Sequence, residues 1–240
     1  MKKKILIIAV AACLLALTIA GTSIAYFTDT DEYTNVFTAG NVKISLTEAV
    51  AAKDSLGHIR IGAPETRIDY NDNEVYRPLF PMQIIEKDPR ITNTGSELAY
   101  VGAIIDVTNA NNANNANGDL YNVLSATATE GKTTITDFIK GIDTSAAIVK
   151  VVEITNGFRI YVIYNDYLET TADDNSVTIF NEIQIPATWD NAQMACVNGL
   201  TVEVQAFATQ VAGFNNAEEA ILGAFGSNED FTWGAYPTNP

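Results

Sequence analysis

Two apolar runs joined by a short turn constrain the fold of this 240-residue chain most strongly. Residues 148–164 read IVKVVEITNGFRIYVIY, in which β-branched and aromatic residues flank Asn156-Gly157. Such residues favour extended strands, and an Asn-Gly pair readily takes the positive φ angles of a type I′ turn. The sequence therefore predicts an antiparallel hairpin here, and a fold built on β-sheet.

Alternation of apolar and polar residues predicts further strands. In 41–48 (NVKISLTE), Val42, Ile44 and Leu46 face one way and the polar residues between them face the other, which is typical of a half-buried strand. The other stretches predicted as strands are 82–93, 98–108, 176–186 and 200–211, with a turn at Asn93-Thr94-Gly95-Ser96.

Only one stretch, 216–225 (NAEEAILGAF), has apolar residues at the spacing that predicts an amphipathic helix. Asn216 with Glu219 resembles a capping box, and Gly226 is predicted as the C′ residue just beyond the helix. Short helical or irregular pieces are expected at 119–129 and 133–142, and an exposed loop in the Asn- and Ala-rich stretch 109–118. Many short strands with one terminal helix predict an all-β chain, folded as a single antiparallel β-sandwich domain over 41–240.

The start of the chain has the pattern of a signal peptide. Lys2–Lys4 are followed by the apolar run Ile5–Ala20, and Ser23 and Ala25 supply the small residues that a cut before Tyr26 requires. The sequence therefore predicts a signal peptide over 1–25. The alternative is an uncleaved anchor, since the run falls only slightly short of the roughly 20 residues that span a bilayer.

Charge and cysteine content narrow the classes of partner. The formal net charge is −15, and the three lysines of the leader are its only charged residues, so the chain after Ala25 carries −18. Nucleic acid and anionic lipid both bind to basic surfaces, so this strong negative charge argues against both as partners. The membrane is then met only through the leader before cleavage. Cleavage also removes Cys13 and leaves Cys196, so no internal disulfide can form.

Residues typical of catalysis are scarce. His58 is the only histidine, and neither HExxH nor GxSxG occurs. His58 is expected on an exposed strand or loop, and Cys196 as a buried, unreactive thiol. The acidic stretches 69–74 and 173–175 offer oxygen ligands for Ca²⁺ without the spacing of an EF-hand, and Zn²⁺ could use His58 only in an unusual way. The sequence thus predicts no catalytic residue and no cofactor, and Ca²⁺ or Zn²⁺ remain the metal alternatives.

Two stretches near the start carry a resemblance to a known family. GTSIAYFTD (21–29), followed by FTAGNVKI (37–44), resembles the N-terminal signature of the TasA/camelysin family. Weaker similarities follow in the same order along the chain, at 93–95, 99–101, 206–210 and 213–220. The stretches 51–80 and 109–145 match nothing in the family.

The resemblance implies a function as well as a fold. It implies a signal peptidase of the SipW kind that recognises Ser23 and Ala25 and cuts between Ala25 and Tyr26. It also implies a jelly-roll-like β-sandwich with a short C-terminal helix. It implies a protein secreted to the extracellular matrix or cell surface that builds biofilm-matrix fibres by donor-strand complementation. The donor or edge segment is then 26–40. Its apolar residues, the expected polymerisation interface, are Tyr26, Phe27, Tyr33, Val36 and Phe37.

Three functions stay open at this point. The fibre reading implies head-to-tail partners of the same chain, together with a related fibre subunit. Other family members are described as casein-cleaving metallo-endopeptidases, although no metal motif is visible here. The third function is a monomeric secreted sandwich that binds a ligand or serves as an accessory fibre protein. Whether the N-terminal segment docks on its own sandwich or on a neighbour's is also left open by the residues.

Overall fold

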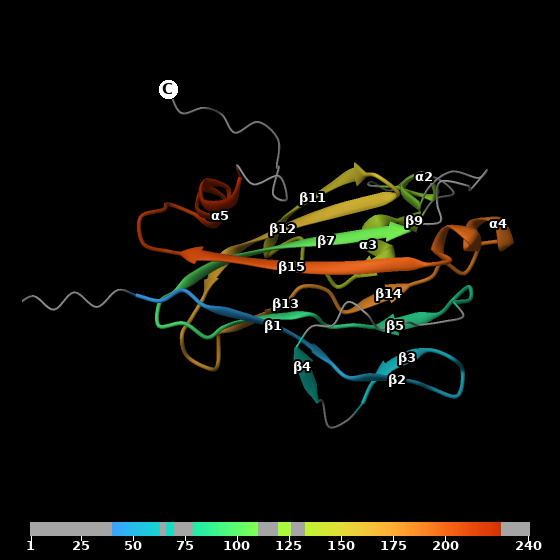
Figure 1. Cartoon of the computed structure of the whole chain (residues 1–240), viewed down its shortest axis with the longest axis horizontal. Helices are drawn as coiled ribbons and strands as arrows, with labels where there is room; N and C mark the ends of the chain where they lie inside the picture. The colour runs from blue at the N-terminus through green and yellow to red at the C-terminus, as the bar shows by residue number, and fades with distance from the viewer. Residues whose placement is uncertain (1–39, 63–65, 70–78, 110–119, 126–132, 227–240) are drawn as a thin grey trace, which may run out of the picture. The chain divides into compact units, whose positions relative to one another are not determined.

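A computed structural model describes residues 40–62, 66–69, 79–109, 120–125 and 133–226 (Figure 1). The leader and the segment 26–39 lie outside these ranges, as do the acidic stretch 70–74 and most of the Asn-rich stretch. Described residues form mostly β-strands in antiparallel sheets, with a short helix near the C-terminus. The predicted all-β, antiparallel fold class is therefore confirmed.

Three larger sheets and one two-stranded pair make up the fold. The first sheet has the order β13 (Ser176–Thr178), β6 (Arg90–Asn93), β1 (Ile44–Ala49), β4 (Arg67–Asp69). The second has the order β10 (Ile139–Lys140), β14 (Glu182–Gln184), β5 (Ile84–Glu86), β3 (Ile59–Ile61), β2 (Ala51–Lys53). The third has the order β11 (Ala147–Ile154), β12 (Gly157–Leu168), β7 (Ala99–Asn109), β15 (Leu200–Gln210). A parallel pair joins β8 (Leu124–Ser125) and β9 (Thr133–Thr134).

The helical elements are short. They are α2 (Leu120–Val123), α3 (Ile135–Phe138), α4 (Asn191–Met194), a 3₁₀ turn at Ala195–Val197 and α5 (Ala217–Phe225). The first two fall in 119–129 and 133–142, where short helical pieces were expected. Asn109, the first residue of the predicted Asn-rich loop, is instead the buried last residue of β7, and its side chain donates to the backbone oxygen of Cys196 at 2.5 Å.

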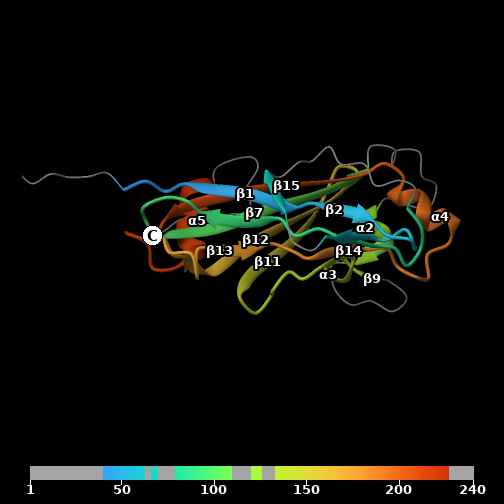
Figure 2. The same ribbon diagram turned by 90° about the horizontal axis from the view of Figure 1, so that it is seen from below.

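The first two sheets form one layer of a sandwich, because β1 continues into β2, β5 into β6, and β13 towards β14. The third sheet forms the facing layer, as Figures 1 and 2 show. Ile91 and Ile183 from the first layer belong to the same buried cluster as Val101, Phe158 and Ile160 from the second. The sandwich is therefore held by apolar side chains from both layers, as the alternating sequence predicts.

Two stretches predicted as single strands are each divided in two. Residues 82–93 contain β5 and β6, and residues 176–186 contain β13 and β14. The breaks lie opposite each other: Lys87 N donates to Asn181 O at 3.0 Å, and Ile179 N donates to Pro89 O at 2.8 Å. Pro89 has no N–H to donate, so it cannot continue a regular ladder.

The predicted hairpin of β11 and β12 is confirmed, but its turn is displaced by one residue. Ile154 pairs with Gly157, so Thr155 and Asn156 form the turn, and of these only Asn156 has a positive φ, 65°. Gly157 is already a strand residue. A Cβ there would lie closer than 3.0 Å to the backbone oxygen of Val107 on β7. This glycine is therefore required by the close approach of two strands, and the type I′ assignment was wrong.

Helix α5 covers part of the outer face of the third sheet (Figure 1). The Asn216 side chain accepts from Glu219 N at 2.8 Å, as the predicted cap requires. The Glu219 carboxylate accepts from Asn215 N, one residue earlier than a capping box demands. Gly226 is the C-cap residue itself, with φ −65°, so its prediction as a C′ residue was wrong by one position.

Candidate functional site

The predicted site residues all precede the described part of the chain. Ser23, Ala25 and Tyr26 at the expected cut, and Phe27, Tyr33, Val36 and Phe37 beyond it, lie outside the described ranges. The structure does describe the place where this segment joins the sandwich. We call residues 26–39 the arm, and Gly40–Lys43 together with the turn Asn93–Glu97 the arm root.

Backbone hydrogen bonds fasten the arm root to the first sheet. Thr94 N donates to Lys43 O at 2.8 Å, and Ser96 N donates to Asn41 O at 2.9 Å. In return, Asn41 N donates to the Ser96 hydroxyl at 3.1 Å. The chain that enters β1 is thus held on one side over three residues before the strand begins.

Gly95 allows the turn to approach the entering chain this closely. A Cβ at Gly95 would lie 2.7 Å from Lys43 N and closer still to Asn41 O. Both neighbours are backbone atoms, and Asn41 O also accepts from Ser96 N, so the entering chain cannot move aside without loss of that bond. The turn signal at 93–96 was visible in the sequence, whereas its contact with 41–43 was not.

Asn93 ties the arm root to a third part of the chain. Its side chain is buried, and Nδ2 lies within hydrogen-bonding distance of the backbone oxygens of Glu97 (2.8 Å), Glu169 (3.1 Å) and Leu168 (3.2 Å). Its Oδ1 accepts from Gly95 N at 3.0 Å. The turn, the entering chain and the end of β12 therefore form one hydrogen-bonded unit.

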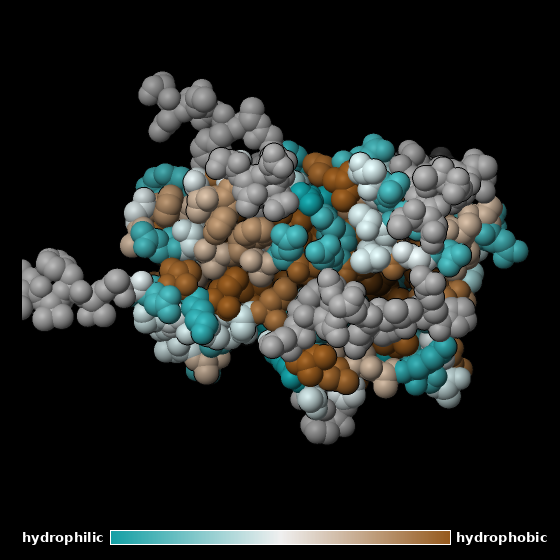
Figure 3. Space-filling view, in the orientation of Figure 1, coloured by the Kyte–Doolittle hydropathy of each residue, from teal (hydrophilic) through white to brown (hydrophobic). Residues whose placement is uncertain are grey.

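The sandwich has apolar side chains that are only partly covered along the side where β1 and β15 lie. β15 is the terminal strand of the third sheet, and β4 pairs with β1 only at Thr47–Ala49. Val42, just before β1, is an inward-facing but half-buried apolar residue. The others, on the two strands themselves, are Ile44, Leu46, Leu200, Val202, Ala206 and Ala208. Figure 3 shows apolar surface in the band between β15 and β1. We call this band the lateral face.

Buried ion pairs lie where the first layer divides into two sheets. Val42, Ile44 and Leu46 point inwards, and Glu48 continues this alternation along β1. The Glu48 carboxylate lies 2.9 Å from Lys87 Nζ, and both side chains are about 6% exposed. Beside them, Arg67 on β4 donates to the Asp88 carboxylate at 2.6 Å. Alternation predicted the inward face but not that it would include charges, which are tolerated here because each has a partner.

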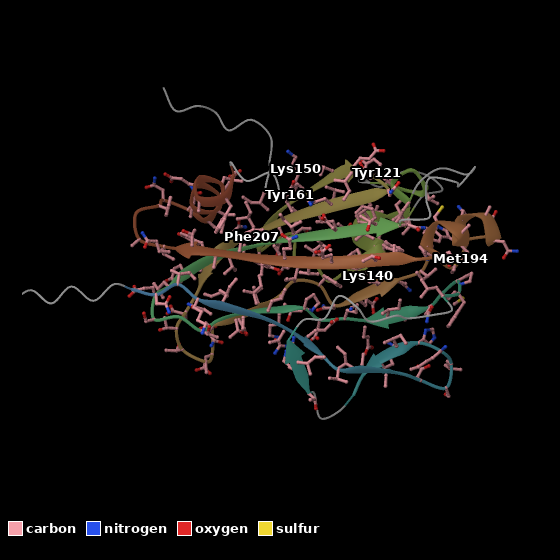
Figure 4. All side chains as sticks on the ribbon, viewed as in Figure 1. Tyr121, Lys140, Lys150, Tyr161, Met194 and Phe207 are labelled. Atoms are coloured by element: carbon pink, nitrogen blue, oxygen red, sulfur yellow. The ribbon has the colours of Figure 1, made fainter. Side chains whose placement is uncertain are left out.

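The outer face of the third sheet carries another charged pair. Arg159 donates to both carboxylate oxygens of Asp106 at 2.6 Å, and this hydrogen bonding raises the pKa of Arg159 above its ordinary value. Figure 4 shows Lys150, Tyr161 and Phe207 on this face, near α5. A planar two-point pair of this kind fixes the register of β12 against β7.

His58 and the acidic stretch 173–175, both considered for metal binding, make structural contacts in the described part of the chain. His58 is half-buried, so its prediction as an exposed residue was wrong: Nδ1 accepts from Ile84 N at 3.0 Å, and the ring packs against Phe80. Cys196 is buried, as predicted. Asp174 and Asn175 use their backbone oxygens to accept from Glu169 N and Asn93 N.

A metallo-endopeptidase needs a metal bound by several side chains that converge. Among the residues that the structure describes, no group of three or more His, Cys, Asp or Glu residues could hold a metal ion. The only histidine already uses one ring nitrogen as an acceptor. The described donor set therefore does not fit a catalytic metal.

Comparisons with known proteins bear on the start of the chain. No curated protein and no solved structure matches the chain. Within the described ranges, no helix is long and apolar enough to cross a membrane. Residues 1–55, which comprise the leader, the arm, β1 and β2, match the family model described as camelysin metallo-endopeptidase, which confirms the TasA/camelysin resemblance and indicates a secreted or surface protein.

Proposed function

We propose that this chain is a secreted structural subunit of extracellular biofilm-matrix fibres, assembled by donor-strand complementation. The arm of one subunit adds as a strand to the sandwich of the next. The observation that carries this proposal is the arm root: four hydrogen bonds hold Asn41 and Lys43 against the turn where the arm begins, and Gly95 allows this close approach. A segment that only trailed from the domain would need no such anchorage.

The length of the arm supports the proposal. Its fourteen residues, Tyr26 to Ala39, reach about 46 Å when extended at about 3.3 Å per residue. The longest strand of the sandwich, β12, has 12 residues and so spans about 40 Å. An extended arm is therefore long enough to run along a whole neighbouring sandwich.

The lateral face has the chemistry that a donor strand would use. Half-buried apolar side chains on β1 and β15 can receive the apolar residues of the arm, such as Tyr26, Phe27 and Phe37. Main-chain hydrogen bonds to a strand edge would supply affinity, and side-chain pockets would supply specificity. Addition in one direction does not close on itself, so it yields filaments.

Removal of the arm tests the proposal. Protein that begins at Tyr26 is expected to form filaments in electron micrographs, whereas protein that lacks Tyr26–Thr34 is expected to stay monomeric by light scattering. A matched pair of full-length variants refines the test. Replacement of Tyr26, Phe27 and Tyr33 by Ser should abolish filaments, and replacement of Thr28, Thr30 and Thr34 by Ser should leave them. Filaments that still form after the deletion would contradict the donor-strand proposal.

A second function is favoured by one finding, the description of the matching family as a metallo-endopeptidase. Casein zymography of the purified protein, with and without a chelator, tests it. Activity that is lost both with EDTA and in the His58→Ala variant would overturn the structural proposal. Monomers that neither assemble nor cleave casein would instead favour a ligand-binding or accessory fibre protein.

A further inference from the structure

We infer that the far end of the sandwich, opposite the arm root, is a contact surface for a second copy of this chain, made by Leu56 and Met82. We call these two side chains, with the loops 54–58 and 80–83 that carry them, the far-end patch. The inference rests on the proposed function. It concerns a different surface from the lateral face, and it can fail while that function holds.

The far-end patch and the arm root lie at opposite ends of the first layer. The chain runs from Ile44 to Lys53 through β1 and β2, ten residues that span about 33 Å. It then turns back through loop 54–58 into β3, with Lys53 paired to Ile59. Figure 1 shows the start of β1 at one end and the β2–β3 hairpin at the other.

Side-chain and backbone contacts join the two loops of the patch. Gln83 Nε2 donates to Gly57 O at 2.8 Å, and Gln83 Oε1 accepts from Phe80 N at 3.2 Å. Within loop 54–58, the Asp54 carboxylate accepts hydrogen bonds from Leu56 N and His58 N. Partial desolvation would raise the pKa of Asp54, but these hydrogen bonds outweigh it, so the pKa lies below its ordinary value. The loop is thus internally bonded at neutral pH.

This bonded end presents the two most exposed large apolar side chains among the described residues. Leu56 is 74% exposed and Met82 is 62% exposed. A single exposed leucine would need no explanation. Here the two lie on loops that contact each other through the hydrogen bond from Gln83 to Gly57 O.

The backbone of Met82 supplies an independent observation. Its φ is 68°, a left-handed conformation that glycine or asparagine adopts far more readily than methionine. Met82 N also donates to Ile185 O at 3.1 Å, which fixes the residue in place. Strained residues of this kind gather at sites of interaction, where the side chain has a use that offsets the conformation.

Head-to-tail assembly determines what meets the patch. When all subunits share one orientation, the arm-root end of each subunit faces the far end of the next. An arm of about 46 Å that runs along a sandwich of similar length brings these two ends together. Leu56 and Met82 both lie beyond residues 1–55, which match the family model, so we expect this contact to be particular to this chain.

The test is a double variant of the whole protein, Leu56→Ser with Met82→Gly. Glycine relieves the left-handed backbone and both sites are exposed, so the melting temperature should not fall. Loss of one or two buried side chains should raise the critical concentration for filament assembly by about tenfold or more. The matched control replaces Val50 and Ile68 by Ser. These residues are each 41% exposed but lie midway along the first layer, and their loss should leave assembly unchanged.

A mixing experiment separates this inference from the proposed function. The double variant keeps its arm, so it should still add to one end of a wild-type filament and then stop growth. A minor fraction of it should therefore shorten wild-type filaments, and the control variant should not. If the wild-type protein forms no filaments at all, the proposed function fails and the far-end contact fails with it. Wild-type filaments, together with a double variant that assembles at the wild-type critical concentration, overturn the far-end contact alone. If the double variant has a lower melting temperature than the wild-type protein, the single variant Leu56→Ser replaces it, and its critical concentration tests the far-end contact.

Discussion

At the scale of single residues, two glycines are required because backbone atoms of a neighbouring strand or loop lie where a Cβ would be. Gly157 and Gly95 both have ordinary φ angles, yet a Cβ at either would collide with backbone atoms of another strand or turn. Asn156 carries the left-handed conformation that the sequence suggested for the Asn-Gly pair. The requirement for glycine therefore arises from strand packing, which no local turn rule can anticipate.

Gly157→Ala should consequently destabilise the protein by about 1–3 kcal/mol, because β12 and β7 must separate to admit the methyl group. Gly62→Ala is the control, since no atom of the described residues beyond its chain neighbours lies within 4 Å of a Cβ there. It should change the unfolding free energy by less than about 0.5 kcal/mol. Urea unfolding followed by circular dichroism measures both. Equal stabilities for the two variants would contradict the close approach of Gly157 to Val107.

At the scale of elements, strand alternation extends to charged residues. In 83–93 every second residue is buried, and these include Lys87 as well as Ile85 and Ile91. Glu48 continues the inward face of β1 in the same way. The two strands thus bring opposite charges together inside the sandwich, at the point where the first layer divides.

Removal of one partner should be much worse than removal of both. Lys87→Met alone is expected to cost about 3–5 kcal/mol, because it removes the Lys87 ammonium from the buried Glu48 carboxylate. The double variant with Glu48→Leu should recover most of that loss. Lys140→Met, which breaks a half-exposed pair with Glu182 at 3.6 Å, should cost less than about 1 kcal/mol. A double-mutant cycle in urea measures the coupling, and additive losses would speak against a buried pair.

At the scale of the whole molecule, charge opposes assembly. The chain carries −15 overall, and −18 once the leader and its three lysines are gone. Subunits in the proposed filament would therefore repel one another, and the proposed donor strand and end-to-end contact would have to overcome this repulsion.

Salt should accordingly favour filaments. An increase of ionic strength from about 0.01 M to about 0.1 M shortens the Debye length from about 30 Å to about 10 Å, which should lower the critical concentration. NaCl and CaCl₂ at equal ionic strength form the comparison, read by sedimentation. Equal effects indicate screening, and a larger effect of CaCl₂ indicates bound Ca²⁺. Assembly that weakens with added NaCl would contradict the repulsion.

The sequence by itself determined the fold class, most of the strands, the terminal helix and the family resemblance of the first 55 residues. These follow from local patterns: alternation with a period of two, helical spacing, turn residues and a leader. The tertiary structure decided the displaced hairpin turn, the glycine at 157, the Glu48–Lys87 pair and the anchorage of 41–43 on the turn at 93–97. It also decided that Leu56 and Met82 share the end opposite the arm root. Each of these joins residues far apart in the chain. Their pairing depends on how strands align across and between sheets, which the spacing of residues along a single strand does not contain.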